Sequence, residues 1–149
     1  MKRMRSRILG LVAVIAASAS VAVVAVASSG QAAGLPSYTK GYATWPKLNK
    51  KPIRNEDPRT GHAGTKNVFV SKRKVGKRYP NGAVVVKTIV DPGAKFISKV
   101  AVMRKVNGRW QYIEYTRSAP SARYTILAQG ALCQGCHMQV RSNDYVFTK

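Results

Sequence analysis

Two cysteines and a histidine stand close together in the run Cys133-Gln-Gly-Cys-His137. Cys-x-x-Cys-His is typical of c-type haem attachment, in which both thiols bind the porphyrin vinyl groups and the imidazole becomes an axial iron ligand. One helical turn brings Cys133 and Cys136 under the ring and places His137 beneath the iron. The chain has no other cysteine that could complete a zinc site. The run therefore predicts one covalently attached haem c per chain, with a redox-active dithiol or a local disulfide as alternatives.

The N-terminus has the outline of an export signal. Residues 1–7 are basic, residues 8–27 are apolar, and small residues follow as far as Ala33. This pattern predicts a secretory signal peptide over residues 1–33 and a haem domain over residues 34–149. The apolar run is also just long enough to span a bilayer, so an uncleaved N-terminal anchor is the alternative. Either interpretation predicts a periplasmic domain, with membrane contact only if the segment is not cleaved.

The charge of the chain is strongly positive. Its 26 lysines and arginines and five acids give a formal net charge of +21. Four of the basic residues lie in the first seven positions, so the remainder still carries +17. Such a field favours an acidic redox partner. Nucleic acid is not an expected partner, because the basic residues are scattered and accompany no recognition helix or single-strand-binding pattern.

The segments that would position the motif read mainly as strands. Strand patterns cover residues 67–71, 83–90, 99–106 and 109–116. Asn107-Gly108 joins the last two and favours a type I′ hairpin turn. Residues 34–64 lack a regular period and are expected to wrap around the domain, with a short helix over residues 39–45. A helix is also expected from Ser121 towards Gln129, and another over the haem motif. The predicted class is α+β, dominated by an antiparallel meander of four to five strands.

Several runs in this order resemble the cytochrome P-460 family, which also includes the cytochromes c′-beta. The runs are Tyr79-Pro-Asn-Gly-Ala-Val-Val-Val-Lys87, Val100-Ala-Val-Met103, Gly108-Arg-Trp110, the haem motif and Asp144-Tyr-Val-Phe147. The resemblance covers roughly residues 46–149. It implies a sheet-rich homodimer with one five-coordinate c-type haem, whose far face is open to small nitrogen ligands. The family's enzymes oxidise hydroxylamine, whereas its cytochrome c′-beta members bind nitric oxide or carbon monoxide.

Lys87 is an unusual residue for a core strand. Alternation along the strand places it on the same side as Val85 and Ile89, between apolar neighbours that would lower the pKa of a buried amine. The resemblance implies that this lysine lies against the haem, because the family's enzymes link the corresponding lysine covalently to the ring. The alternative is a solvated sheet face, with the ammonium reaching water.

The side of the iron opposite His137 is less well defined by the sequence. The family's enzymes carry a distal carboxylate that accepts protons from hydroxylamine, and Glu114 is the one acid on a predicted strand. It is a weak candidate for that base, and no acid lies between it and His137. We therefore expect weak or absent hydroxylamine oxidation, since a missing base typically costs a factor of about 10²–10⁴. Met103 and His62 are the candidate sixth ligands, although the family's open face favours neither.

These observations predict a c-type haem protein with an open distal site that binds or oxidises small nitrogen species such as nitric oxide and hydroxylamine. Activity as a hydroxylamine-oxidising enzyme stays open. The first alternative is a six-coordinate periplasmic electron-transfer cytochrome. The second is a haemless structural domain with a disulfide. An optical spectrum distinguishes all three.

Overall fold

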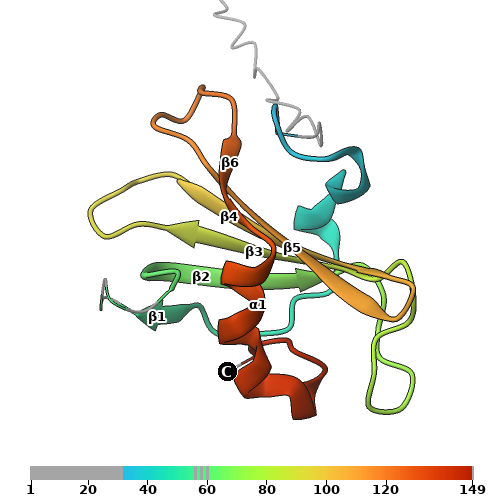
Figure 1. Ribbon diagram of the computed structural model, residues 1–149. Coiled ribbons are helices and arrows are strands. Elements are labelled where there is room, and N and C mark those ends of the chain that lie inside the picture. The colour runs from blue at the N-terminus through green and yellow to red at the C-terminus, as the bar shows by residue number, and fades with distance from the viewer. Residues whose placement is uncertain (1–31, 56, 58, 60, 149) are drawn as a thin grey trace, which may run out of the picture.

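The computed structural model describes residues 32–148 except residues 56, 58 and 60, and its centre is an antiparallel sheet (Figure 1). The sheet has six strands, each paired with the next in sequence order. The strands are β1 (Ile53–Asn55), β2 (Gly64–Val70), β3 (Val84–Val90), β4 (Lys99–Val106), β5 (Arg109–Thr116) and β6 (Thr125–Gln129). The helical elements are η1 (Ser37–Thr39), η2 (Tyr42–Thr44), α1 (Ala131–His137) and η3 (Met138–Asn143).

The predicted sheet-dominated α+β class is confirmed. Strands β4 and β5 occur at their predicted bounds. Between them, Asn107 and Gly108 have φ angles of 50° and 77°, as a type I′ turn requires. The sheet has six strands instead of four to five. One addition is the short strand β1, which lies inside the segment expected to have no regular structure.

The second additional strand corrects a prediction. The helix expected from Ser121 towards Gln129 was wrong, because Thr125–Gln129 forms the edge strand β6. Leu, Ala and Gln favour helices locally, but pairing with β5 satisfies the backbone of this segment and overrides that weak preference. The helix expected over residues 39–45 is also replaced, by the separate turns η1 and η2. Gly41, with a φ of 74°, interrupts helical geometry between them.

One face of the sheet is covered by the N-terminal part of the described chain. Valines of β3 and β4 form a buried cluster on this face with Leu35, Tyr115 and Tyr124. Three aromatic side chains of the preceding segment, Tyr38, Tyr42 and Trp45, pack against that cluster. This arrangement confirms the prediction that the segment wraps around the domain.

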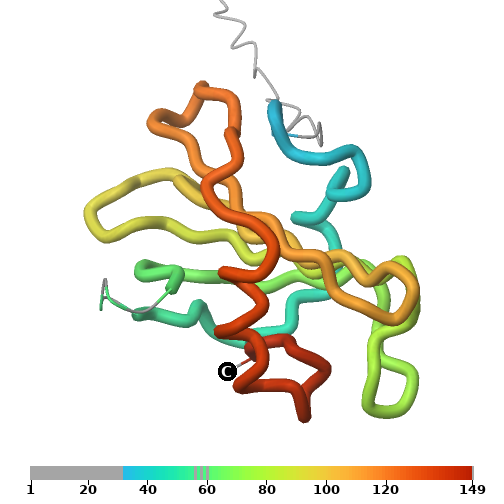
Figure 2. The backbone as a smooth tube through the Cα atoms, in the orientation of Figure 1, coloured from blue at the N-terminus to red at the C-terminus, as the bar shows by residue number. Residues whose placement is uncertain are grey.

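The opposite face is covered by the C-terminal segment, which crosses in front of the strands in Figure 2. The buried cluster on this face includes Val68, Val85, Met103 and Tyr112 from the sheet. Val146 from the end of the chain completes it, and several half-buried residues pack against it. This is the face on which α1 presents the cysteine and histidine residues.

The predicted signal peptide or anchor falls almost entirely within residues 1–31, which lie outside the described part of the chain. In the part that is described, no helix combines the length and the apolar character needed to cross a membrane.

Candidate functional site

Helix α1 carries both cysteines and His137. It follows β6 directly, through Gly130, whose φ of 70° is a left-handed conformation that glycine adopts at little cost. The N–H of Gly130 donates to the carbonyl oxygen of Tyr112 at 3.1 Å, which fixes the start of the helix against β5. Cys133 is half-buried and Cys136 is exposed, and both are free thiols. Their i, i+3 spacing makes them neighbours on the helix surface.

His137 is held in one orientation. Its side chain is buried, and its ring lies 4.8 Å from the Tyr112 ring and 5.3 Å from the Phe147 ring between centroids. Its Nδ1 bonds to the carbonyl oxygen of Tyr145 at 2.6 Å. Because a carbonyl only accepts, Nδ1 must carry the hydrogen, and the lone pair lies on Nε2. A backbone carbonyl on the outer nitrogen is the usual arrangement for a metal-binding histidine.

The protonation state of His137 also suits a metal ligand. Burial lowers its pKa to about 4, an effect that the bond to Tyr145 opposes and that the positive charge of Lys87 reinforces. The imidazole is therefore neutral at neutral pH. The neutral form is the one that coordinates iron.

The Tyr145 carbonyl is placed by the side chain of Asp144. Oδ2 of Asp144 accepts from Lys105 Nζ at 2.6 Å and from the Tyr79 N–H at 2.7 Å, and Oδ1 accepts from Trp110 Nε1 at 3.3 Å. Asp144 and Tyr145 have φ angles of 53° and 65°, a region that residues other than glycine seldom adopt. The hydrogen bonds of the carboxylate stabilise this strained turn, and the turn directs the carbonyl to the histidine.

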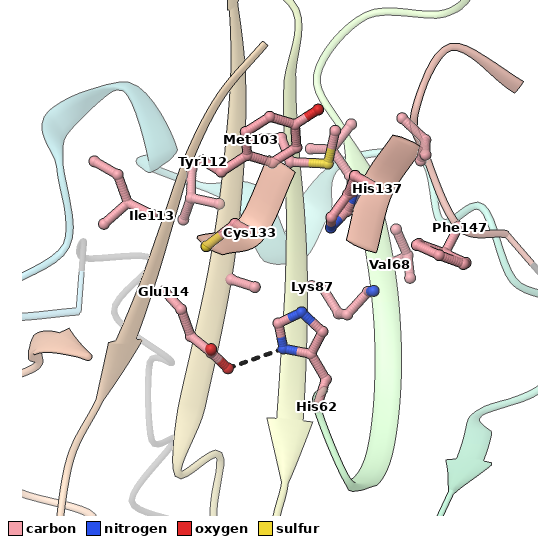
Figure 3. A pocket seen from close by; sticks show the side chains of 14 residues that line it. His62, Val68, Lys87, Met103, Tyr112, Ile113, Glu114, Cys133, His137 and Phe147 are labelled. Atoms are coloured by element: carbon pink, nitrogen blue, oxygen red, sulfur yellow. Dashed lines mark hydrogen bonds and ion pairs between the residues drawn. The ribbon is translucent and has the colours of Figure 1, made fainter. Parts of the chain in front are cut away.

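A pocket opens between α1, the C-terminal segment and the sheet (Figure 3). Its empty volume, counted together with its open mouth, is about 410 Å³. The lining residues are His62, Val68, Val85, Lys87, Ala101, Val102, Met103, Tyr112, Ile113, Glu114, Cys133, His137, Val146 and Phe147. Apolar walls with a few convergent ionisable groups are typical of cofactor and ligand sites.

Lys87 lies in this pocket and not on a solvated sheet face. It stands opposite Val68 of β2 and Ala101 of β4, and its Nζ lies 5.5 Å from the centroid of the Phe147 ring. Burial lowers the pKa of Lys87 to about 8; the charge of Lys66 lowers it further, and that of Glu114 opposes the change. A substantial fraction of the amine is thus neutral slightly above neutral pH. This agrees with the desolvated lysine that its apolar neighbours predict.

His62 and Glu114 meet at the same pocket. His62 belongs to the loop before β2 and Glu114 to β5, and Nδ1 of the histidine lies 2.9 Å from Oε1 of the carboxylate (Figure 3). The sequence named His62 as a candidate iron ligand and Glu114 as a candidate base. It did not predict that the two residues would form a pair.

Met103 lies on β4 and also lines the pocket. Its side chain is 6% exposed and packs in the cluster that contains Val85 and Tyr112. This position is consistent with core packing, and it leaves the sulfur near the space that a cofactor would fill.

Comparison with protein families bears on the identity of that cofactor. The model of the cytochrome P-460 family matches residues 39–148. The chain belongs to the cytochrome P-460 family. No curated protein and no solved structure matches the chain. Membership of the cytochrome P-460 family implies a haem cofactor.

The donor groups in the pocket and on the adjoining helix α1 fit the haem of a cytochrome P-460. Two thiols lie one helical turn apart, and a neutral imidazole beside them keeps its Nε2 lone pair. Valines and Phe147 provide the apolar walls that a porphyrin requires. In the described residues, no group of three or more His, Cys, Asp and Glu side chains is gathered as a metal cluster would need.

The structure brings together most of the residues predicted for the haem site of a cytochrome P-460. Lys87, Glu114, Cys133 and His137 line one pocket, whereas Cys136 is exposed on α1 and does not line it. Sequence reasoning missed the Tyr145 carbonyl, because a backbone acceptor leaves no mark on residue type.

Proposed function

We propose that this chain is an exported c-type haem protein whose pocket binds or oxidises small nitrogen species such as nitric oxide and hydroxylamine. The observation that carries the proposal is the setting of His137. Its Nδ1 is fixed by Tyr145, and its neutral ring stands beside Cys133 on a pocket that also contains Lys87. A structural histidine would need neither adjacent free thiols nor an open pocket.

The residues of α1 would hold the cofactor. Cys133 and Cys136 would form thioethers with the porphyrin, and Nε2 of His137 would coordinate the iron. When bound, haem supplies an iron centre that takes up small ligands and exchanges electrons. Burial lowers the pKa of Lys87 to about 8, so a larger fraction of its amine is neutral than in an exposed lysine, and the neutral amine has the chemistry needed for an additional link to the ring.

The rest of the pocket supports a small uncharged ligand. Val68, Val85 and Phe147 offer no hydrogen bonds from their side chains and so exclude water in favour of apolar or weakly polar molecules such as nitric oxide. The pairing of His62 with Glu114 adds a proton-accepting group that strand position alone did not indicate. Hydroxylamine therefore remains in the proposal together with nitric oxide.

Haem staining and an optical titration test this proposal. Protein made with the c-type maturation machinery should keep stained haem on a denaturing gel, and replacing both Cys133 and Cys136 with Ala should abolish the stain. The ferric protein should be high-spin and should bind nitric oxide. An unstained band of intact polypeptide would overturn covalent attachment, and a haem protein that binds no nitric oxide would overturn the ligand assignment.

The electron-transfer alternative rests on a specific observation. Both candidate sixth ligands, His62 and Met103, line the pocket. A low-spin spectrum that becomes high-spin on replacing either residue with Ala would assign that residue to the iron. Such a result would favour the electron carrier over the ligand-binding protein.

We also propose that the domain works in the periplasm as a homodimer and meets an acidic redox partner. The export signal and the net charge support the location and the partner. Strand β6 lies at the sheet edge, and its Ile126 and Leu127 are 55% and 51% exposed, a combination that another copy of the chain could cover. Membrane contact is proposed only if the N-terminal segment stays attached. Sedimentation analysis with and without the segment tests both the dimer and the anchor.

A further inference from the structure

His62 and Glu114 form a partly buried pair between residues that are far apart in the sequence. They are 52 residues apart, and their side chains are 20% and 13% exposed. The backbone of His62 is left-handed, with a φ of 65°, which is uncommon for a residue other than glycine. Strain of this kind in a pocket-lining residue is a feature of sites where geometry serves function.

The loop that carries His62 is held close to the sheet. At Gly64, where β2 begins, a Cβ atom would lie 2.2 Å from the carbonyl oxygen of Val90, so the two backbones approach more closely than a side chain would permit. This contact fixes the end of the loop beside β3. The His62 side chain therefore comes from a loop whose end at Gly64 is packed against β3.

The pair has a defined hydrogen-bond polarity. A carboxylate oxygen accepts, so Nδ1 of His62 donates to Oε1 of Glu114, and the imidazole tautomer that donates from Nδ1 carries its lone pair on Nε2. In Figure 3 the other nitrogen of His62 is turned away from Glu114 and towards the interior of the pocket. A histidine oriented by a carboxylate, with its second nitrogen facing a ligand space, is the arrangement of a general base.

The other ionisable groups around the pair come from several elements. Lys87 on β3 and Cys133 and His137 on α1 line the same pocket, and Lys66 on β2 acts on Lys87. The two lysines disfavour a second positive charge nearby, whereas the Glu114 carboxylate favours one on the ring it contacts. Glu114 is the acid that lines the pocket among the described residues, and it already accepts a hydrogen bond. The second ring nitrogen of His62, Nε2, is turned to the interior of the pocket and is therefore the acceptor directed at the ligand space.

We infer that His62 accepts a proton from a small protonated ligand in the pocket and that Glu114 is the positioning residue that orients its ring. In this step an N–H or O–H bond of a hydroxylamine-class ligand breaks and an Nε2–H bond forms on His62. The bonding electrons stay on the ligand, and the new imidazolium faces the carboxylate of Glu114. No oxidant is consumed. This inference rests on the proposed function, because it requires a haem pocket that admits such ligands.

Two probes of similar size separate proton acceptance from access. Hydrogen cyanide must lose a proton to bind ferric haem, whereas nitric oxide carries none. The variants are His62→Gln and Glu114→Gln. The matched control is Asp91→Asn, which removes an acid paired with Lys99 outside the pocket. Stopped-flow association rates of both probes are measured on haem-loaded wild type and variants, with circular dichroism and the Soret band as checks of folding.

We expect His62→Gln to slow hydrogen cyanide association by about 10²-fold or more, the usual contribution of a general base. Glu114→Gln should slow it by about 10- to 100-fold, as loss of an orienting partner does. Nitric oxide association should stay within twofold throughout, and Asp91→Asn should change neither rate.

Each other result counts against the inference. Cyanide rates in His62→Gln within twofold of wild type would remove the base. If His62→Gln slowed or accelerated hydrogen cyanide and nitric oxide equally, His62 would control access to the pocket by its size. If the wild-type spectrum were low-spin and that of His62→Gln high-spin, His62 would be an iron ligand. As a second readout, the C–O stretching band of the carbon monoxide complex should shift in His62→Gln, and an unmoved band would place His62 away from the ligand. A wild type that binds no haem or no nitric oxide would instead refute the proposed function, and this inference with it.

Discussion

Replacing Asp144 with Asn should destabilise the domain by removing the charge that balances Lys105. The ammonium and carboxylate are 5% and 6% exposed, and their atoms lie 2.6 Å apart. An amide could still accept hydrogen bonds from Tyr79 and Trp110, but it could not neutralise the buried ammonium. Removing one partner of such a pair typically costs about 3–5 kcal/mol, because an uncompensated charge is left in the interior.

A loss of this size would be a large share of the domain's free energy of unfolding. Domains of this size are usually stable by about 5–15 kcal/mol, so Asp144→Asn should lower the urea midpoint strongly at pH 7. Asp57→Asn is a matched control, since its partner Arg59 is 88% exposed and such pairs contribute little. The double variant Lys105→Met with Asp144→Asn removes both charges, and it should lose less stability than the two single variants added together.

The same network predicts a response to acid. Burial raises the pKa of Asp144, but the bonds from Lys105, Tyr79 and Trp110 outweigh that effect and hold it below the ordinary value of 3.8. The stabilisation is therefore present above about pH 4 and is lost as pH falls through the lower folded-state value. Asp144→Asn should lack this acid-dependent component. A destabilisation below about 1 kcal/mol, or additive effects in the double variant, would refute the account of the buried pair.

Three further predictions concern other parts of the molecule. If the Lys87 amine is free, the free energy of unfolding should rise between about pH 8 and 10.5, because the unfolded state still binds a proton that the folded state has released. Urea titrations of Lys87→Met should show no such rise. If Lys87 is linked to haem, the rise is absent and mass spectrometry of a digest finds haem joining it to the cysteine peptides. Gly64→Ala should lower the free energy of unfolding by about 2 kcal/mol or more, because a Cβ atom there would meet the Val90 carbonyl. Gly108→Ala should lower it by about 1 kcal/mol, because no atom lies within 4 Å of a Cβ at that position. Equal urea midpoints for the two variants would contradict this prediction. Affinity for an acidic redox partner should fall steeply with salt in calorimetry, since the attraction is screened within about 8 Å at physiological ionic strength, whereas salt-independent binding would indicate an apolar interface.

Local signals were sufficient for the centre of the sheet. Alternation and the Asn107-Gly108 turn determine β4 and β5 without reference to the rest of the chain. Strand β6 could not be predicted in this way. Its Leu127, Ala128 and Gln129 favour a helix in isolation, and the extended form depends on pairing with β5 across an irregularity at Glu114 and Tyr115.

In the candidate site too, local patterns predicted some residues, whereas a contact that depends on the tertiary fold was not predicted. The motif indicated Cys133, Cys136 and His137, and strand alternation indicated the face of Lys87. The meeting of His62 with Glu114 depends on how a loop folds over the sheet, and no local pattern encodes a contact across 52 residues.

The turn at Asp144 and Tyr145 links the orientation of the His137 ring to local opening of the chain at Tyr79. Asp144 accepts the hydrogen bond of the Tyr79 amide and its neighbour Tyr145 provides the carbonyl that bonds to His137, so we expect an opening that breaks the first bond to loosen the second. We therefore expect amide hydrogen exchange at Tyr79 to report how often the turn that holds His137 opens under native conditions. We expect this exchange rate to set an upper limit on how fast the His137 ring can leave its position, and the limit can be measured from the polypeptide alone.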